Sequence, residues 1–426
     1  MTFLVIGAGP AGLAAVKSLK QAGLPVQAVE KHGDVGGQWL YGAENSAVYA
    51  STHLISSKRT TAFADYPMPE DWPAYPGHAQ VAEYLRGYAR HFDLYPLIRF
   101  STAVTALRRE GDGWRADFDD GSSAAYEGVV IANGHLSEPE IPAIPGSFDG
   151  ILMHSKDYRT PDIFDGKTVL VAGMGNTGCD IVVDAIHRAR AVLWSVRGGN
   201  HFVPKFIAGK PADEANHRPK RFILPRALRA MLHEPLLRLL VGPPERFGLP
   251  RPRHRLYDRT PIVNSLVLQH LGQGDVSLRK PIRRFDGNRV VFEDGRSDEV
   301  DLVLLATGYR IVFPFLADPA ALNLQPRTGA PHLYLNIFPP ADNGLFVAGL
   351  LEGAGVGWAG RALQTDLIAA WLKARRERPQ AAAAFRRRIA EHCAAPPAKG
   401  RGDHGIFVDF LTYKRDLQRA IAELGG

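Results

Sequence analysis

Residues 3–12 read FLVIGAGPAG, a short apolar run that leads into a GxGxxG pattern. The run predicts a buried strand, and the alanine- and leucine-rich stretch at 13–20 predicts a helix after the glycine turn. A second strand is expected at 26–30, where it ends in Glu30. In such a βαβ unit the helix N-terminus faces a pyrophosphate, and the acid after the second strand hydrogen-bonds ribose hydroxyls. The opening of the chain therefore predicts a dinucleotide site.

A second copy of this unit is predicted further along the chain. Its strand, glycine turn, helix and next strand are expected at 167–172, 173–178 (GMGNTG), 179–189 and 191–196. The last strand ends not in an acid but in Ser195 and Arg197, a hydroxyl donor and a permanent cation that suit the 2′-phosphate of NADPH. Glu30 would repel that phosphate, and the segment GGQW at 36–39 favours a bulky flavin nucleotide near the first turn. We therefore expect FAD at the first site and NADPH at the second.

The residues predicted to bind the two cofactors lie in the turns and at the strand ends that follow them. Those expected to contact FAD are Gly7, Ala8, Gly9, Pro10, Ala11, Gly12, Glu30, Lys31, Gly37, Gln38 and Trp39. Those expected to contact NADPH are Gly173, Gly175, Asn176, Thr177, Gly178, Ser195 and Arg197. No grouping of His, Cys and Asp has the spacing of metal ligands, so no metal site is predicted.

The rest of the chain predicts an α/β fold with two Rossmann-like dinucleotide-binding domains, the NADPH domain inserted into the FAD domain. Antiparallel strands are expected at 99–107, 114–118 and 129–132, and the strand ends at Asn133-Gly134 and Thr307-Gly308-Tyr309 predict crossings between domains. By analogy with two-dinucleotide flavoproteins, we expect FAD-domain segments at 1–160 and 307–426 and an NADPH domain at 161–306. Residues 204–261 are interpreted as a surface excursion, in which Pro235 interrupts an amphipathic stretch at 226–241. A peripheral membrane contact is the less favoured interpretation of that segment.

Composition narrows the functional class. The 426 residues are 45% hydrophobic and 22% charged, as in a folded enzyme. Two distant cysteines, Cys179 and Cys393, indicate a reducing compartment and exclude a disulfide scaffold. The net charge is +7, but the basic residues are interpreted as scattered, so no nucleic-acid partner is expected. No apolar run is long enough for a transmembrane anchor. We expect a cytoplasmic protein, with a homodimer allowed.

The segment between the two units resembles a known connector. Its pattern, Phe148-x-Gly150-x-x-x-His154-x-x-x-Tyr158, is similar to that of the flavin-containing monooxygenases, class B flavoproteins that also include Baeyer–Villiger enzymes. Baeyer–Villiger enzymes usually carry Trp at the last position, so Tyr158 favours the N- and S-oxygenating branch. Further matches lie at 63–69 (FADYPMP), 246–250, 264–274, 286–290 (DGNRV), 306–309 (ATGY) and 338–340. The resemblance covers nearly the whole chain.

This resemblance implies that NADPH reduces FAD, that O2 then forms a C4a-hydroperoxyflavin, and that a soft nucleophile in a small substrate takes its distal oxygen. His154 and Tyr158 would lie in the interdomain linker, and Gln364 would lie close to the flavin. No catalytic acid or base is assigned. One departure is Ile55, because family members usually place an asparagine there beside the flavin. Ser56 or Ser57 would then replace its hydrogen bond, or bound NADP+ would stabilise the peroxide.

Three other functions stay open at this point: Baeyer–Villiger oxygenation of ketones, a non-oxygenating FAD/NADPH reductase, and a redox-sensing protein without turnover. The connector pattern argues against the last two. A disulfide reductase would need a CxxC pair beside the flavin, which this chain lacks. The sequence does not identify the substrate.

Overall fold

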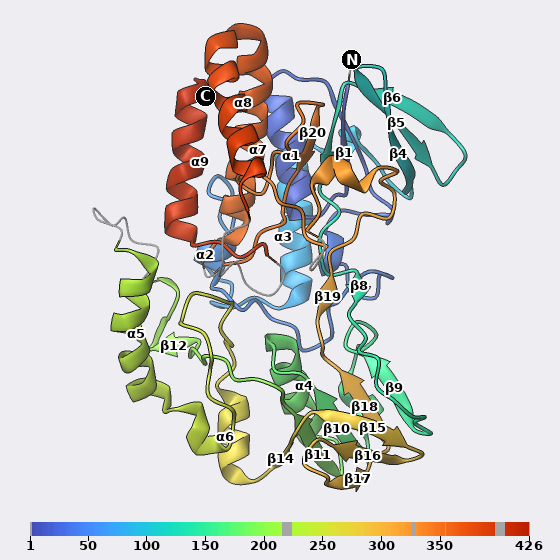
Figure 1. The fold of residues 1–426 in the computed structure, drawn as a ribbon, viewed down its shortest axis with the longest axis vertical. Helices are drawn as coiled ribbons and strands as arrows, with labels where there is room; N and C mark the ends of the chain where they lie inside the picture. The colour runs from blue at the N-terminus through green and yellow to red at the C-terminus, as the bar shows by residue number, and fades with distance from the viewer. Residues whose placement is uncertain (1, 215–223, 326–328, 354, 397–404, 426) are drawn as a thin grey trace. The chain divides into compact units, whose positions relative to one another are not determined.

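A computed structural model describes residues 2–214, 224–325, 329–353, 355–396 and 405–425 (Figure 1). The chain divides into two compact units. Unit 1 comprises Met1–Ser46, Ser56–His135 and Arg310–Gly426, and unit 2 comprises Ala47–Ile55 and Leu136–Tyr309. The long excursion into unit 2 runs over Leu136–Tyr309, so residues 136–160, which were expected in the FAD-domain segment 1–160, lie in unit 2. A short second excursion, residues 47–55, was not expected.

Unit 1 is built on a five-stranded parallel sheet of order β20-β7-β1-β2-β3. Its strands are β1 (Phe3–Ile6), β2 (Val26–Val29), β3 (Ile98–Arg99), β7 (Gly128–Ile131) and β20 (Leu345–Val347). β1, β7 and β20 are buried along their whole length, as expected for a sheet that is covered on both faces. The helices of the unit are α1 (Pro10–Gln21), α2 (Lys58–Thr61), α3 (His78–His91), α7 (Gly357–Glu377), α8 (Pro379–Ala394) and α9 (Phe410–Leu424).

The expected antiparallel strands need correction. The stretch 99–107 is divided between β3, in the parallel sheet, and β4 (Val104–Glu110), which pairs with β5 (Gly113–Phe118) and through it with β6 (Ser123–Tyr126). The stretch 129–132 forms β7, which runs parallel to β1 and β20. Its continuous apolar run was the signal of a strand buried on both faces, whereas an antiparallel strand with one wet face alternates.

Unit 2 repeats the plan with a parallel sheet of order β14-β11-β10-β18-β9. Its strands are β9 (Ile151–His154), β10 (Thr168–Ala172), β11 (Ala191–Ser195), β14 (Val276–Arg279) and β18 (Leu302–Leu305). The helices are α4 (Asn176–Ile186), α5 (Arg226–Val241) and α6 (Leu266–Gln273). An antiparallel sheet adds β15 (Ile282–Asp286), β16 (Arg289–Phe292) and β17 (Ser297–Glu299). Two Rossmann-like sheets confirm the predicted α/β class.

The helix at 226–241 is continuous, so the interruption expected at Pro235 is wrong. A proline inside a helix removes one hydrogen bond, here to the carbonyl of Met231. Pro235 and Met231 are both exposed, so water can take that bond. The remaining short elements are β8 (Glu138–Pro139), β12 (Phe206–Ile207), β13 (Lys210–Pro211), β19 (Tyr309–Arg310) and the 3-10 turns at 37–39, 95–97, 161–164, 244–247 and 319–322.

Candidate functional site

The first glycine turn of unit 1 is shaped for a phosphate. Gly7 has φ +105°, and a Cβ there would lie 2.7 Å from the carbonyl oxygen of Ala132. α1 begins at Pro10 after an N-cap, Gly9, that has no side chain to bond the amides of the first turn. The N–H groups of Ala11 and Gly12 therefore have no side-chain cap, and the helix dipole is directed at the same point. This arrangement fits the pyrophosphate of a dinucleotide.

Glu30 fixes the turn against the end of β2. Its buried carboxylate accepts from the backbone N–H of Ala8 at 2.7 Å and from the backbone N–H of His32 at 3.0 Å. Each carboxylate oxygen has capacity for a second hydrogen bond, so Glu30 can still accept from ribose hydroxyls. Lys31, the next residue, is exposed.

The loop that carries Gly37, Gln38 and Trp39 is held by Asp34. Its carboxylate accepts from Arg86 Nε at 2.6 Å and from the hydroxyl of Tyr95 at 3.0 Å. Burial raises the pKa of Asp34, but these donors outweigh burial and hold it below its usual value. Gly37, Gln38 and Trp39 form a single 3-10 turn of half-buried residues. Asp34 therefore anchors the start of this loop to α3 and to Tyr95.

Unit 2 contains a second turn with the same geometry. Gly173 has φ +124°, and a Cβ at Gly178 would lie 2.6 Å from the carbonyl oxygen of Gly173. Gly175 is exposed and has nothing near its missing Cβ, so a ligand can approach it. The indole N–H of Trp194 donates to the Gly173 carbonyl at 2.8 Å. This hydrogen bond was not predicted, because in the sequence Trp194 has the pattern of an ordinary core residue.

The two units differ at the residue that follows β2 in unit 1 and β11 in unit 2. In unit 1 the last register pair is Ile6 with Val29, and in unit 2 it is Ala172 with Ser195. The residue that corresponds to Glu30 is therefore Val196, a buried aliphatic side chain that places no negative charge there.

Arg197 and Ser195 differ in what they can offer a ligand. Arg197 is exposed, and within the described ranges no residue forms a hydrogen bond or ion pair with its side chain. Ser195 is buried, and its hydroxyl donates to the carbonyl of Lys280 at 2.9 Å. The hydroxyl donor expected at Ser195 is therefore already used within the protein, and Arg197 is the donor that remains.

Asn176 and Thr177 open α4, and Asn176 has a structural task as well. Its side-chain amide donates to the carbonyl of Pro261 at 3.1 Å and accepts from the backbone N–H of Val263 at 2.7 Å. Any contact of Asn176 with a dinucleotide would then use its backbone. Thr177 is half-buried at the start of the helix.

The two connector residues, which were expected in an interdomain linker, are instead buried within unit 2. His154 ends β9, its Nδ1 accepts from the backbone N–H of Lys156 at 3.1 Å, and its ring packs edge-on against Tyr309. Burial lowers the pKa of His154 below its usual value, which favours the neutral ring. Tyr158 stacks on Phe164 with ring centroids 5.2 Å apart. Both rings therefore belong to the packing of unit 2, and the hydroxyl of Tyr158 also donates to Asp184 at 2.8 Å.

Two carboxylates on α4 form a network that the sequence did not reveal. Asp180 accepts from the hydroxyl of Tyr49 at 2.9 Å, and Asp184 accepts from the hydroxyls of Ser51 at 2.6 Å and Tyr158 at 2.8 Å. Burial raises the pKa of Asp180, although hydrogen bonds from Asn264 and Tyr49 oppose this. The i,i+4 spacing of Asp180 and Asp184 was the available signal, but their partners are far away in the sequence.

This network holds the short excursion 47–55 on α4. The excursion ends in Ile55, whose side chain is 40% exposed, and the chain then enters unit 1 at Ser56. The backbone carbonyl of Ser56 accepts from the hydroxyl of Thr61 at 3.3 Å. Ile55, for which the family resemblance implies an asparagine, thus belongs to a segment that unit 2 holds in place.

Gln364 is connected to the first glycine turn through Gly349. It is fully buried in α7, its Oε1 accepts from the backbone N–H of Gly349 at 2.9 Å, and its Nε2 donates to the hydroxyl of Tyr413 at 2.8 Å. A Cβ at Gly349 would lie 2.6 Å from the Cβ of Ala11, so Gly349 packs directly on the turn. The amide of Gln364 is bonded within the protein at both ends, so Gln364 acts on the turn through Gly349.

A charged cluster lies at the carboxyl edge of the unit 1 sheet. His135 follows β7, Glu352 follows β20, and His135 Nε2 is 3.6 Å from a carboxylate oxygen of Glu352. Arg361 on α7 donates to the carbonyl of Gly357 at 2.7 Å, and burial lowers the pKa of Arg361 to about 10. Ligands of open α/β sheets bind at this edge, where the Gly7 turn also lies. No spacing in the sequence pointed to this cluster.

Other kinds of site find no support in the described part of the chain. Among residues 2–214, 224–325, 329–353, 355–396 and 405–425, no three His, Cys, Asp or Glu side chains come together as metal ligands. Both cysteines are free thiols, and burial raises the pKa of Cys179 well above its usual value, so its thiol is unreactive. No helix within those ranges combines the length and the apolar character needed to cross a bilayer.

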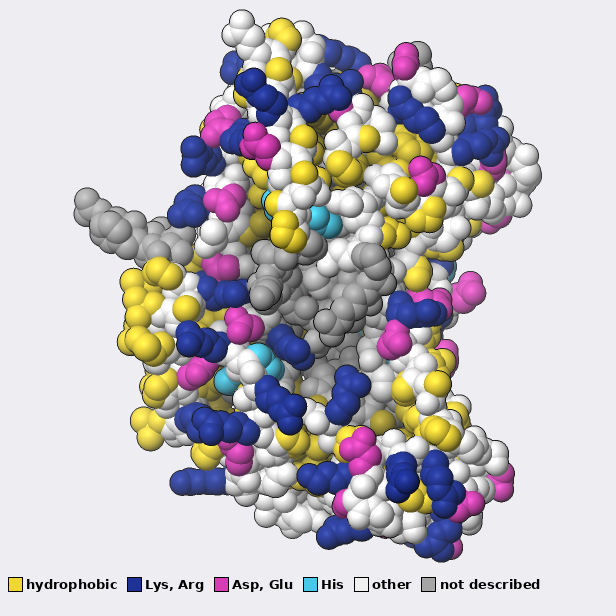
Figure 2. All heavy atoms as spheres, viewed as in Figure 1, with side chains coloured by type: hydrophobic (Ala, Val, Ile, Leu, Met, Phe, Trp, Pro, Cys, Tyr) yellow, Lys and Arg dark blue, Asp and Glu magenta, His cyan; other side chains and the backbone are white. Residues whose placement is uncertain are grey.

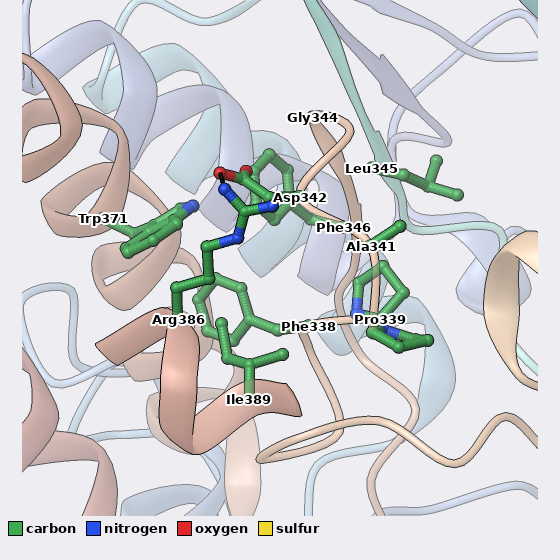
Figure 3. A pocket seen from close by; sticks show the side chains of 11 residues that line it. Phe338, Pro339, Ala341, Asp342, Gly344, Leu345, Phe346, Trp371, Arg386 and Ile389 are labelled. Atoms are coloured by element: carbon green, nitrogen blue, oxygen red, sulfur yellow. Dashed lines mark ion pairs between the residues drawn. The ribbon is translucent and has the colours of Figure 1, made fainter. Parts of the chain in front are cut away.

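The notch beside Phe338 and Trp371 is too small for a substrate (Figure 3). It has room of about 10 Å³, which is enough for a single water. The guanidinium of Arg386 lies over it, 3.4 Å from the carboxylate of Asp342. This notch in unit 1 is therefore a surface feature of the packing between α7 and α8.

Comparisons with known proteins agree with this geometry. A family profile described as "Flavin-binding monooxygenase-like" matches residues 2–422. Flavin-containing monooxygenase 5 of Mus musculus is 32% identical over 374 residues, which are 82% of this chain and 69% of the mouse protein.

Two solved structures share the fold. S-allyl-L-cysteine S-oxygenase from Allium sativum has a TM-score of 0.67 at 23% identity over 99% of this chain and 88% of its own. The open crystal structure of cyclohexanone monooxygenase has a TM-score of 0.71 at 20% identity over 99% of this chain and 98% of its own. With its paired glycine turns and a match over nearly its entire length, the chain belongs to the flavin-binding monooxygenase-like family, the FAD-dependent NADPH monooxygenases.

Proposed function

We propose that the protein uses NADPH and O2 to oxygenate a soft nucleophilic atom, an amine nitrogen or a sulfide sulfur, in a small molecule. The observation that carries this proposal is the difference between the two turns. Glu30 follows the first turn, whereas a buried valine and the exposed Arg197 follow the second. One turn therefore suits the unphosphorylated ribose of FAD, and the other suits the 2′-phosphate of NADPH.

In each unit, different residues would bind the pyrophosphate and the ribose end of the dinucleotide. In unit 1, the amides of Ala11 and Gly12 would receive the pyrophosphate of FAD, and Glu30 would accept from the ribose. In unit 2, the N-terminus of α4 would receive the pyrophosphate of NADPH, and Arg197 would bind its 2′-phosphate. When bound, the flavin supplies hydride acceptance and oxygen activation. The chain itself binds and orients the cofactors and the substrate. It also excludes water from them.

The choice of heteroatom oxygenation rests on the connector. Tyr158 occupies the position at which Baeyer–Villiger enzymes usually carry tryptophan. Its phenol is buried, packs between Tyr49 and Phe164, and reaches Asp184 with its hydroxyl. Of the relatives, the garlic protein is named an S-oxygenase, whereas cyclohexanone monooxygenase shares the fold at a similar TM-score. The preference for attack by nitrogen or sulfur over insertion beside a carbonyl therefore rests on Tyr158.

Product analysis with labelled oxygen tests this proposal. The purified protein is supplied with NADPH, ¹⁸O2 and, in separate reactions, a tertiary amine, a thioether and a cyclic ketone. We expect one ¹⁸O atom in an N-oxide or sulfoxide and none in a lactone. A labelled lactone as the main product would assign the Baeyer–Villiger reaction instead. NADPH oxidation that proceeds with an added electron acceptor in the absence of O2, and leaves no label in any organic product when O2 is present, would show a reductase.

A further inference from the structure

Helix α5 is turned the opposite way from an ordinary surface helix. Its polar side faces its own unit: Glu234 accepts from the backbone N–H of Leu256 at 2.7 Å, and His233 lies 2.6 Å from the hydroxyl of Tyr257. Arg229 lies over the ring of Tyr257 and is buried. A helix on a soluble protein normally places its apolar stripe inward. In α5 the polar residues make the inner contacts.

The outer side of α5 is consequently apolar. At helical spacing of three and four, it presents exposed large hydrophobic side chains, which are Leu228, Met231, Leu232, Leu236, Leu239 and Leu240. Leu239 is 82% exposed. Figure 2 shows hydrophobic side chains gathered at the left margin, over α5. A contiguous exposed strip of this kind marks an interaction surface. We call it the α5 strip.

The positive charge of the chain is concentrated in the sequence segment that contains α5. Residues 204–261 contain 13 lysines and arginines against 5 acids, whereas the rest of the chain contains 38 against 39. The entire positive excess therefore lies in this segment, which corrects the view that the basic residues are scattered. Beyond the helix, Arg246, Arg251, Arg253 and Arg255 are exposed, and Figure 2 shows Lys and Arg side chains beside the strip.

We propose that the α5 strip docks on an anionic lipid bilayer, with the helix lying in the plane of the surface. An in-plane helix buries its apolar face at the boundary of headgroups and acyl chains, and neighbouring basic residues are drawn to anionic lipids. A second copy of the chain is the poorer occupant, because a symmetric contact would bring two strongly positive segments together. The proposal is independent of the chemistry at the glycine turns.

Vesicle flotation with the whole 426-residue chain, loaded with flavin, tests the proposal. The protein is mixed with vesicles of phosphatidylcholine alone or of phosphatidylcholine with phosphatidylglycerol, at low and at high salt. We expect it to float with the mixed vesicles at low salt, to float much less at high salt, and to stay behind with the neutral ones. The variant Leu239→Glu should bind the mixed vesicles roughly tenfold or more weakly, because a leucine that enters the bilayer is replaced by an acid.

Ile141→Glu is the matched control, since Ile141 is also exposed in unit 2 but lies outside the α5 strip. It introduces the same charge and should leave binding unchanged. An absence of flotation, an unchanged Leu239→Glu, or an equal loss in Ile141→Glu would each overturn the proposal. Sedimentation velocity supplies a further outcome: a dimer that Leu239→Glu converts to a monomer would assign the strip to a second copy. Flavin content and the melting temperature verify that both variants are folded.

Discussion

Replacing Arg197 by alanine is expected to weaken the binding of NADPH far more than that of NADH. Arg197 is exposed two residues after the end of β11, and its guanidinium has no partner among the described residues, so a phosphate would gain its full donor set. The hydroxyl of Ser195 already donates to Lys280, so it does not replace the lost donor. One charge-assisted hydrogen bond contributes about 1.5–3 kcal/mol, which corresponds to roughly a ten- to hundredfold rise in the dissociation constant for NADPH.

The assay compares the dissociation constants of NADPH and NADH under anaerobic conditions by changes in flavin absorbance or fluorescence. Arg197→Lys keeps the charge but loses the planar fork, so it should fall between wild type and Arg197→Ala. Arg283→Ala is the control, because Arg283 is another exposed arginine of unit 2 that lies away from the glycine turn. An equal loss of affinity for both nucleotides in Arg197→Ala would refute the phosphate assignment. So would an equal effect in Arg283→Ala.

Three further predictions concern single side chains. Glu30→Gln should weaken FAD binding roughly tenfold or more, because the NH2 group of the new amide would face the N–H of Ala8 or His32, and two donors cannot form a hydrogen bond. Titration of the apoprotein with FAD measures this affinity, and an unchanged value would contradict the prediction. Burial lowers the pKa of His154 from 6.5, so its contribution to stability is complete above about pH 6.5 and is lost as the pH falls through the folded-state pKa. The melting temperature of His154→Asn should therefore fall less than that of wild type between neutral and mildly acidic pH, and parallel curves would show that His154 does not titrate. Ile55→Asn should lower the hydrogen peroxide formed per NADPH by about two- to tenfold if the amide restores one hydrogen bond, whereas a higher yield would show that isoleucine is adapted to its position.

The two glycine turns could be predicted because every part of each turn is local. Strand, GxGxxG and helix follow one another within about twenty residues, and the backbone of Gly7 or Gly173 admits no other residue. The direction of a strand is not local. The stretch 129–132 forms β7 between β1 and β20, and β20 comes from a part of the chain more than 200 residues away. The parallel direction of β7 follows from its place between β1 and β20, which the local sequence does not specify.

Hydrogen-bond partners that lie far apart in the chain also could not be predicted from the sequence. Gln364 resembled a residue at the flavin, but whether its amide was free depended on Gly349 and Tyr413. The stretch 226–241 has an amphipathic pattern, although an interruption at Pro235 was expected. Periodicity identifies an apolar face without saying whether it turns inward or outward, and in α5 it turns outward.

The departure at Ile55 takes on a different meaning once residues 47–55 are placed. In the sequence, Ile55 stands between the flavin segment at 36–39 and Ser56, which suggests that unit 1 determines its surroundings. In the structure, the segment is held by hydrogen bonds from Tyr49 to Asp180 and from Ser51 to Asp184, and both acids lie on the helix that begins at the second glycine turn. The position of Ile55 therefore depends on α4. A change of its side chain has to be interpreted together with the carboxylates that hold its segment.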